Sequence, residues 1–270
     1  MGLLAVVGHT TRDVVDSGAA RAGGVPLYAG RALAALGEKA VLITRCAERD
    51  RALLDSLQAL GLPVVWRPEI QSAEFRLEYR GNERTLSIDA LGEPWTPSDA
   101  RGWVGEALGD ADWIHAGALW RGDFPVETLA ELARGRRLSL DGHALVRPAR
   151  TGLIRPDADF DAATLAEVDL LHLSEDEVVA LGLTLDAESL RTLGVPEIVV
   201  TLGDRGAIVV ADGLFTRVPV RPLAGVDPTG AGDAFTAAYI AARRAGRGPA
   251  PSARRATEVV RQVLEERTTP

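Results

Sequence analysis

The sequence reads Gly225-Val226-Asp227-Pro228-Thr229-Gly230-Ala231-Gly232-Asp233-Ala234-Phe235 immediately ahead of an alanine-rich stretch that continues to Arg244. Turn-forming residues pass directly into a helical pattern here, which predicts a helix over Ala234–Arg244 that begins at a glycine-rich loop. The start of a helix leaves backbone N–H groups unpaired and carries a partial positive charge. Small residues at Gly230, Ala231 and Gly232 let a phosphate group approach that backbone closely, so the run is a candidate anion-binding site.

Asp233 stands directly after these small residues. Its carboxylate would repel a phosphate, but it is well placed to accept the proton of a hydroxyl group that attacks phosphorus. We therefore predict Asp233 as a general base, with the backbone over Gly230–Gly232 stabilising the charge on a phosphoryl group in transfer. A simpler interpretation stays open, in which Thr229 or Asp233 only caps the helix.

Outward from this run, short apolar strands alternate with helical segments along most of the chain. The pattern begins with a buried strand at Leu3–Val7 and a helix at Leu27–Leu36. Such alternation predicts an α/β fold, a three-layer doubly wound and mostly parallel sheet with helices on both faces. The other predicted elements are Ala40–Thr44, an amphipathic helix at Arg49–Leu60, Trp113–Ala116, Pro125–Arg134, Arg137–Asp141, Leu170–Leu173, Glu175–Leu181, Ala187–Leu193, Glu197–Thr201, Ala207–Val210 and Phe215–Val218.

One β-rich region interrupts this alternation. Val64–Arg67, Phe75–Tyr79 and Arg84–Ile88 have the composition of strands, and the turn Arg80-Gly81-Asn82-Glu83 joins the last two as a hairpin. Short strands inserted early in an α/β chain predict a small flap beside the main sheet. We expect a single domain over residues 1–270, with a small β-lid formed by segments near 10–24 and 63–92.

Composition argues against several classes of protein. The net charge is −8, which disfavours binding to DNA or RNA, because contacts along a nucleic acid need a basic surface. Cys46 is the only cysteine and Lys39 the only lysine, which excludes an intrachain disulfide, a cysteine zinc site and a Walker-type phosphate loop. No window is apolar enough to span a bilayer, and the N-terminal apolar run fits a first strand better than a signal peptide. We expect a cytoplasmic protein with no membrane or nucleic-acid partner.

The run from Asp227 to Phe235 resembles the signature of the ribokinase family, the PfkB-type carbohydrate kinases, in which an Asp, a Thr and Gly-Ala-Gly-Asp form the anion hole and catalytic base. Asp13 matches a position that binds acceptor hydroxyls in that family, and Gly23-Gly24 is similar to its second sugar-binding segment. The early β-rich insert corresponds to the family's lid. The resemblance implies a kinase that uses ATP and Mg²⁺ and phosphorylates a small sugar, polyol or nucleoside.

Further matches concern the phosphate donor. Ser174-Glu175-Asp176-Glu177 stands where the family has an Asn-x-x-Glu motif that organises magnesium and phosphate, which implies Glu177 as the metal residue and Ser174 as a donor contact. Asp141–Arg147 looks like a loop of the myo-inositol kinase-like members, where Arg147 would hold a phosphate oxygen. The segment Thr201–Gly206 resembles the family's nucleotide-side loop. The residues expected to bind ATP on these grounds are Thr201, Gly203, Gly206, Thr229, Ser174 and Arg147.

Two departures from the family pattern leave the acceptor open. Ser174 replaces the usual Asn, and the segment Gly24–Ala29 lacks the Asn that binds sugar hydroxyls. Tyr28, His9 and His143 are candidates to contact the acceptor instead, although each of them also fits a purely structural role. Likewise, Glu177 also fits a solvated helix position and Arg147 a surface salt bridge.

The leading hypothesis is therefore phosphoryl transfer to a sugar or a myo-inositol-like cyclitol. A nucleoside kinase of the cytidine or adenosine type is the alternative acceptor class. A phosphomethylpyrimidine-type vitamin kinase shares the fold, but the hairpin over Phe75–Ile88 counts against it. A non-catalytic nucleotide or sugar sensor is a hypothesis of another class, motivated by the departures at Ser174 and Tyr28. Pairing of two lids would make a homodimer.

Overall fold

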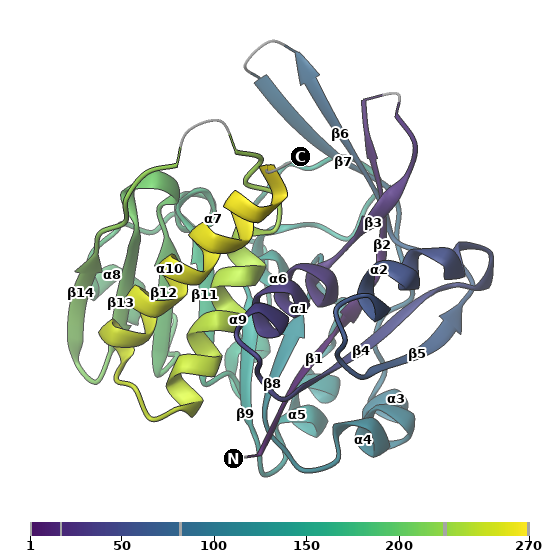
Figure 1. The fold of residues 1–270 in the computed structure, drawn as a ribbon. Coiled ribbons are helices and arrows are strands. Elements are labelled where there is room, and N and C mark those ends of the chain that lie inside the picture. The colour runs from purple at the N-terminus through teal and green to yellow at the C-terminus, as the bar shows by residue number, and fades with distance from the viewer. Residues whose placement is uncertain (1, 17, 81–82, 224–225, 269–270) are drawn as a thin grey trace.

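The structure is a computed structural model that describes residues 2–16, 18–80, 83–223 and 226–268. Its larger sheet is built from the strands β1 (Leu3–His9), β4 (Ala40–Ala47), β5 (Val64–Glu69), β8 (Ala111–Gly117), β9 (Arg137–Asp141), β11 (Leu170–Ser174), β12 (Glu197–Thr201), β13 (Ala207–Ala211) and β14 (Leu214–Val218). Their order across the sheet is β14-β13-β12-β11-β9-β8-β1-β4-β5, as Figure 1 shows in part. Neighbours from β5 to β12 run parallel, whereas β13 and β14 are antiparallel to the strand before them.

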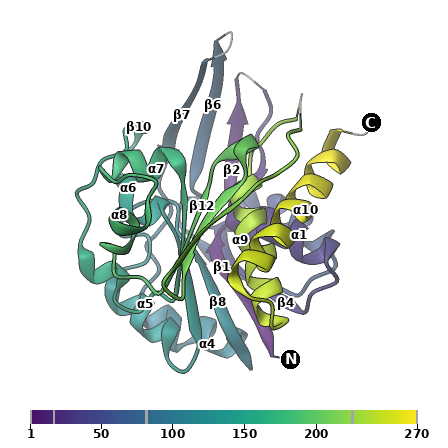
Figure 2. The ribbon, with the colours of Figure 1, turned by 90° about the vertical axis from the view of Figure 1, so that its left-hand side faces the viewer.

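Helices cover both faces of this sheet, which makes the three-layer α/β fold that the alternating pattern predicts (Figure 2). One face carries α1 (Val25–Ala35), η1 (Glu48–Leu54), α2 (Asp55–Gln58), α9 (Ala231–Arg244) and α10 (Pro249–Thr268). The opposite face carries α3 (Pro97–Arg101), α4 (Trp103–Leu108), α5 (Val126–Ala133), α6 (His143–Val146), η2 (Ala162–Leu165), α7 (Glu175–Ala180) and α8 (Ala187–Arg191). A short η3 (Gly203–Arg205) connects β12 to β13.

The first strand shows why the sheet lies between two layers. Leu4 and Val6 pack with the helices α1, α9 and α10, whereas Ala5 and Val7 pack into the separate core on the opposite face. All four are fully buried. A strand that is apolar on both faces is typical of a parallel sheet covered by helices on each side.

A smaller sheet stands above one edge of the larger one and forms the lid (Figure 1). Its strands are β2 (Thr11–Val15), β3 (Arg21–Gly23), β6 (Glu74–Arg80), β7 (Glu83–Ala90) and β10 (Gly152–Leu153), in the order β10-β7-β6-β2-β3. The chain passes from β1 into β2 with only Thr10 between them, so the two sheets are directly connected. Phe75, Leu77 and Ile88 are buried, which gives the smaller sheet an apolar inner face.

The structure corrects three of the predicted elements. Val64–Arg67, expected among the lid strands, lies instead in β5, which pairs in parallel with β4 at the edge of the larger sheet. Val64 and Val65 pack against opposite core clusters, as residues of a sheet strand do. The helix expected over Arg49–Leu60 is mostly the 3₁₀-helix η1, followed by one turn of α2. Its buried side chains are Leu54 at the end of η1 and Leu57 in α2.

The third correction concerns α9, which begins at Ala231 and not at Ala234. Gly230 takes a left-handed backbone conformation with φ of 77° and becomes the N-cap, so Ala231, Gly232 and Asp233 complete the first helical turn. Asp233 therefore lies inside the first turn of α9, whereas the residue pattern predicted that it precedes the helix.

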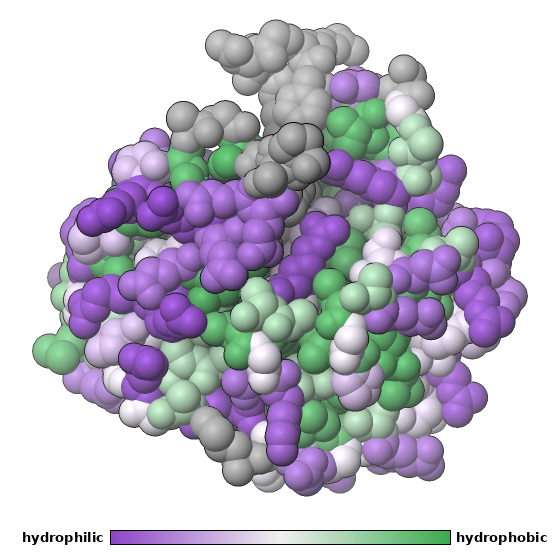
Figure 3. Space-filling model, in the orientation of Figure 1, coloured by the Kyte–Doolittle hydropathy of each residue, from purple (hydrophilic) through white to green (hydrophobic). Residues whose placement is uncertain are grey.

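The C-terminal helix α10 is amphipathic. Its outer face gathers hydrophilic residues, as Figure 3 shows along the helix, and its inner residues Ala253, Ala256 and Val259 are buried on the core. Within the described part of the chain, no helix combines the length and the apolar character that crossing a bilayer requires.

Candidate active site

A cavity of about 540 Å³ lies between the carboxyl ends of the larger sheet's strands and the inner face of the lid. Open α/β sheets bind ligands at this edge, because the loops there leave a crevice. The cavity brings together most of the residues that the sequence predicted for the site. Those that line it are Asp13, Gly24, Tyr28, His143, Arg147, Ser174, Glu177, Thr201, Thr229, Gly230, Gly232 and Asp233.

The start of α9 forms one wall of the cavity. A Cβ atom at Gly230 would lie 2.2 Å from the ring of Tyr28, so only glycine fits against that ring. The amide of Ala231 donates to the carbonyl of Pro228 at 3.0 Å. This hydrogen bond lies within the turn, so the Ala231 amide does not have the anion-binding role that the sequence predicted. Among the residues that the structure describes, no acceptor faces the amides of Gly232 and Asp233. These two amides are thus the ones left to bind an anion.

Asp233 is half-buried in the cavity wall. Desolvation raises the pKa of its carboxyl to about 7, helped by the negative charge of Asp141 and opposed by His115, His172 and Arg147. A carboxylate with a pKa near neutrality is suited to accept a proton from a substrate hydroxyl and release it again.

A chain of buried polar side chains extends below Asp233, and the sequence predictions did not include it. His172 Nδ1 donates to Asp141 Oδ1 at 3.2 Å, and its Nε2 is 3.2 Å from Thr201 Oγ1. On the other side of Asp141, His115 Nε2 lies 3.3 Å from Oδ2. The sequence did contain a signal for this cluster. Asp141 and His172 stand at or near the ends of two predicted strands, and the carboxyl ends of those strands meet at one edge of the sheet.

The charges of this cluster reinforce one another. Burial alone would raise the pKa of the Asp141 carboxyl, but the charge of His115 and the hydrogen bond and charge of His172 hold it well below its usual range. Burial opposes a charge on His172, yet the hydrogen bond and charge of Asp141, with the charges of Glu177 and Asp233, raise its pKa.

Glu177 is held in place by a capping box at the start of α7. The Ser174 amide donates to Glu177 Oε2 at 2.7 Å, and the Glu177 amide donates to Ser174 Oγ at 3.3 Å. His143 Nε2 lies 3.4 Å from Glu177 Oε1. Burial and the nearby Arg147 lower the pKa of His143 to about 4, so this imidazole is neutral. Glu177 is 7% exposed, which disagrees with the interpretation as a solvated helix residue.

A metal ion bound at this site would need water or phosphate ligands in addition to protein side chains. The described residues contain no group of three or more His, Cys, Asp or Glu side chains that could hold one. Magnesium binds through one or two carboxylates, several waters and the phosphates of its nucleotide, and that requirement fits Glu177 and Asp176 on the cavity wall.

Asp13 lies on β2 of the lid and lines the cavity from that side. Its Oδ1 accepts a hydrogen bond from Thr11 Oγ1 at 2.6 Å. A Cβ atom at Gly23 would lie 2.0 Å from Asp13 Oδ2, so Gly23 makes room for this carboxylate although it does not line the cavity. Gly24 has φ of 92°, and a Cβ there would meet the His9 carbonyl oxygen at 2.1 Å.

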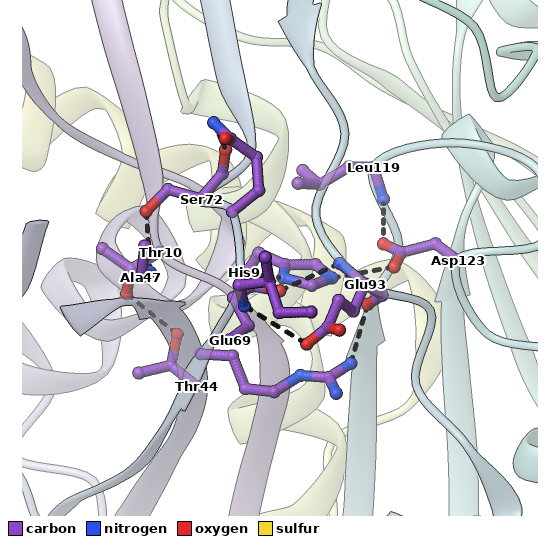
Figure 4. Close-up of polar contacts among 12 residues, drawn as sticks. His9, Thr10, Thr44, Ala47, Glu69, Ser72, Glu93, Leu119 and Asp123 are labelled. Carbon is purple, nitrogen blue, oxygen red and sulfur yellow. Dashed lines mark hydrogen bonds and ion pairs between the residues drawn. The ribbon is translucent and has the colours of Figure 1, made fainter. Parts of the chain in front are cut away.

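His9 lies elsewhere than predicted. It is fully buried outside the cavity lining, with Nδ1 3.2 Å from Glu69 Oε1 and Nε2 2.9 Å from Asp123 Oδ1 (Figure 4). Burial would lower its pKa, but the charges and hydrogen bonds of Asp123 and Glu69 raise it to about 9. Asp123 also accepts from the Leu119 amide. His9 therefore ties the end of β1 to neighbouring segments and does not face an acceptor.

A second cavity, of about 320 Å³, adjoins the first. Gly203, Gly206 and Ala231 line it, and Thr201, Pro228 and Gly232 line both cavities. The remaining wall is largely apolar, with side chains from the segment before α9 and from α10. These are Val220, Pro222, Leu223, Val226, Val260 and Leu264.

The start of α9 and the Asp233 carboxylate thus share one wall of a cavity between a doubly wound sheet and a β-lid, an arrangement typical of small-molecule kinases. The chain matches the family described as "pfkB family carbohydrate kinase" over residues 3–269 and belongs to that family. Its fold is the ribokinase-like α/β fold. Ribokinase from Thermotoga maritima shares this fold with a TM-score of 0.71 and 20% identity, over 98% of this chain and 92% of that one.

Two solved structures are more similar. A pyrophosphate-dependent kinase of the ribokinase family, solved with sulfate, has a TM-score of 0.84 and 25% identity, covering 97% of this chain and 95% of that chain. A structure described as a pyrophosphate-dependent myo-inositol-1 kinase converted into a myo-inositol-3 kinase has a TM-score of 0.81 and 25% identity, covering 97% and 92%.

Curated relatives match over shorter segments. A fructokinase of Salmonella thompson is 36% identical over 86 residues, which are 32% of this chain and 37% of the relative. A cytidine kinase of Thermococcus kodakarensis is 31% identical over 109 residues, which are 38% and 39% of the two chains. The matched segments thus span well under half of either relative.

Proposed function

We propose that this protein transfers the γ-phosphoryl group of ATP to a hydroxyl of a small sugar or a myo-inositol-like cyclitol, with Asp233 as the general base. One observation carries the proposal. The Asp233 carboxylate has a pKa near 7 and lies in the cavity beside the amides of Gly232 and Asp233. A proton acceptor and an anion-binding helix start thus share one wall, which is the arrangement that phosphoryl transfer to an alcohol requires.

The chemical step follows from this arrangement. Asp233 takes the proton of the acceptor hydroxyl, and the hydroxyl oxygen forms a bond to the γ-phosphorus. The bond from that phosphorus to the bridging oxygen breaks, and its electron pair leaves with ADP. The amides of Gly232 and Asp233 bind the charge on the phosphoryl oxygens in the transition state, at the positive end of α9.

The acceptor would lie between Asp233 and the lid. Asp13 offers carboxylate oxygens to acceptor hydroxyls from the lid side, and Thr11 orients that carboxylate. Phe75 and Leu77 of the lid line the same cavity and would cover the acceptor against water. Since an unwanted water molecule at Asp233 would hydrolyse the donor, exclusion of water is the expected role of the lid.

The donor assignment rests on the second cavity. Its volume of about 320 Å³ and its apolar wall suit a nucleotide base, and its boundary with the first cavity at Thr201 and Gly232 would take the phosphates. Glu177 and Asp176 would hold Mg²⁺ that arrives with the donor. When bound, that ion neutralises phosphate charge and orients the phosphates. The pyrophosphate-dependent relatives make pyrophosphate the alternative donor, and it would leave this apolar cavity empty.

A nucleoside is the second candidate acceptor. Tyr28 and Phe75 both line the acceptor cavity, and aromatic rings of this kind stack on nucleobases. The cytidine kinase relative supports the same alternative.

The test is a phosphoryl-transfer assay over free sugars, cyclitols and nucleosides, each with ATP and with pyrophosphate as donor in the presence of Mg²⁺. We expect turnover with ATP and a sugar or cyclitol, reduced about 10²- to 10⁴-fold in Asp233→Asn because the general base is lost. Asp110→Asn is the matched control, since Asp110 is exposed and outside both cavities. Full activity of Asp233→Asn, or ATP binding without transfer to any acceptor in the panel, would contradict the proposal, and the second result would favour a sensor.

A further inference from the structure

A line of buried side chains crosses four strands of the larger sheet and ends between the two cavities. His115 on β8 and His172 on β11 flank Asp141 on β9, at 3.3 and 3.2 Å from its two oxygens. Thr201 on β12 completes the line, with Oγ1 3.2 Å from His172 Nε2. His115 is fully buried, Asp141 is 1% exposed and His172 is 7% exposed. The proposed phosphoryl-transfer step does not require two imidazole side chains beside one carboxylate.

His172 contacts two of the three residues that line both cavities. Thr201 and Gly232 line each cavity, and His172 itself lines the acceptor cavity. A Cβ atom at Gly232 would lie 3.0 Å from His172 Cε1, so the absence of a side chain there lets the imidazole approach the first turn of α9. The ring of Phe235 stacks on the imidazole with centroids 6.2 Å apart and holds its plane.

We propose that His172 is a positioning residue for the phosphate donor, presenting a positive charge to Thr201 and to the start of α9 where the donor's phosphates pass from the apolar cavity to Asp233. The inference rests on the proposed function, because a nucleotide that occupies the apolar cavity and reaches Asp233 has to pass Thr201 and Gly232.

The hydrogen-bond roles follow from a charged imidazole, which donates from both nitrogens. Nδ1 then donates to Asp141, and Nε2 donates to the Thr201 hydroxyl oxygen. Because that oxygen already accepts from His172, the single hydroxyl proton of Thr201 has to point elsewhere. That proton is donated to the Leu173 carbonyl at 3.4 Å, a long hydrogen bond that a bound phosphate oxygen would replace by accepting from the same hydroxyl.

The surrounding charges favour the protonated form of His172. Asp141 faces it from β9, Glu177 from α7 and Asp233 from α9, and together they raise its pKa against the effect of burial. Arg147 after α6 is a cation of the same region, His115 on β8 lies on the far side of Asp141, and His143 is neutral. A fixed cation at this point would offset donor charge in a protein whose only lysine is Lys39.

The test measures binding by titration calorimetry, with Mg·ADP and with pyrophosphate as probes, in an Asp233→Asn background so that Asp233 does not titrate. We expect His172→Gln to weaken ADP binding about 10- to 100-fold at pH 6, the usual worth of a charged hydrogen bond. His172→Phe keeps an aromatic ring that can stack on Phe235, and it should lose at least as much ADP affinity as His172→Gln. Thermal unfolding checks that both variants are folded.

The pH dependence of ADP affinity distinguishes an effect of the His172 charge from an effect of the size and shape of its side chain. In the protein with His172, ADP affinity should fall as the pH rises through the pKa of the imidazole, and this component should be absent in His172→Gln. Asp141→Asn leaves the imidazole in place but removes the carboxylate that favours its charge. The fall in ADP affinity should therefore move to lower pH, which a purely structural role would not cause.

Equal ADP affinity and equal pH dependence with and without His172 would overturn the inference while leaving the proposed function intact. A loss of affinity that is the same at every pH would also overturn it, because the charge would then play no part. If neither ADP nor pyrophosphate binds to the protein that retains His172, the proposed function fails and the inference with it.

Discussion

The carboxyls of Asp141 and Asp233 belong to different elements, the end of β9 and the first turn of α9, yet their ionisation is linked. Desolvation raises the pKa of Asp233, and the charge of Asp141 raises it further, to about 7. The imidazoles of His115 and His172 stabilise Asp141 as an anion at the same time. A carboxylate that stays charged thus interacts with one whose pKa is close to neutrality, and such a separation of pKa values is typical of acid–base catalysis.

The turnover number should depend on pH through Asp233. A general base acts only when it is deprotonated, so kcat should rise with pH up to a midpoint near 7. Arg147 lowers the pKa of Asp233, so Arg147→Gln should shift this midpoint to higher pH. Arg147→Lys keeps the positive charge and is the matched control. Steady-state kinetics from about pH 5 to about pH 9, a range that spans the Asp233 titration, check the prediction, and a midpoint in Arg147→Gln at or below that of the control would contradict it.

Gly230 should tolerate no side chain, for two separate reasons. Its φ of 77° is unfavourable for other residues, and a Cβ atom would lie 2.2 Å from the Tyr28 ring. Gly246 has a similar φ of 81° but open space around its Cα, so Gly246→Ala reports the backbone cost alone. Gly230→Ala should cost about 1–3 kcal/mol more than this control in urea unfolding, the usual cost of overpacking, and should lose activity as Tyr28 is displaced. Equal costs for the two variants would show that Tyr28 moves aside freely.

His9 should contribute to stability in a pH-dependent way. Its pKa is raised from 6.5 to about 9 in the folded protein, so its contribution is complete below pH 6.5 and is lost as the pH rises through 9. The shift corresponds to a contribution on the order of 3 kcal/mol. Below pH 6.5, His9→Gln should be strongly destabilised because Glu69 and Asp123 would remain buried without their cation.

Urea unfolding at about pH 6 and about pH 9.5, on either side of the His9 titration, measures this effect. The difference between His9→Gln and the unmodified protein should shrink at the higher pH. His143→Gln is the control, because the pKa of His143 is lowered to about 4 and does not titrate in this window. A gap between His9→Gln and the unmodified protein that stays constant with pH would mean that folding does not raise the pKa of His9.

Much of the architecture was predictable from local pattern. Arg137–Asp141 and Glu197–Thr201 are strands with the predicted bounds, because β-rich apolar runs bounded by turn residues have few alternatives. Val64–Arg67 was assigned to the lid because composition identifies a strand but not the sheet it joins. That choice depends on the crossover through η1 and α2, which returns the chain parallel to β4.

A helix that begins at a glycine-rich loop was likewise predictable, because Gly230, Gly232 and Asp233 are adjacent in the chain, although the helix begins three residues earlier than predicted. The pairing of His172 with Asp141 and the burial of His9 were not, since their partners are 31, 60 and 114 residues away along the chain. Contacts over such separations depend on the order of strands in the sheet, and no local pattern encodes that order. The pKa of Asp233 has the same origin, because desolvation and the charge of Asp141 exist only once β9 and α9 have packed together.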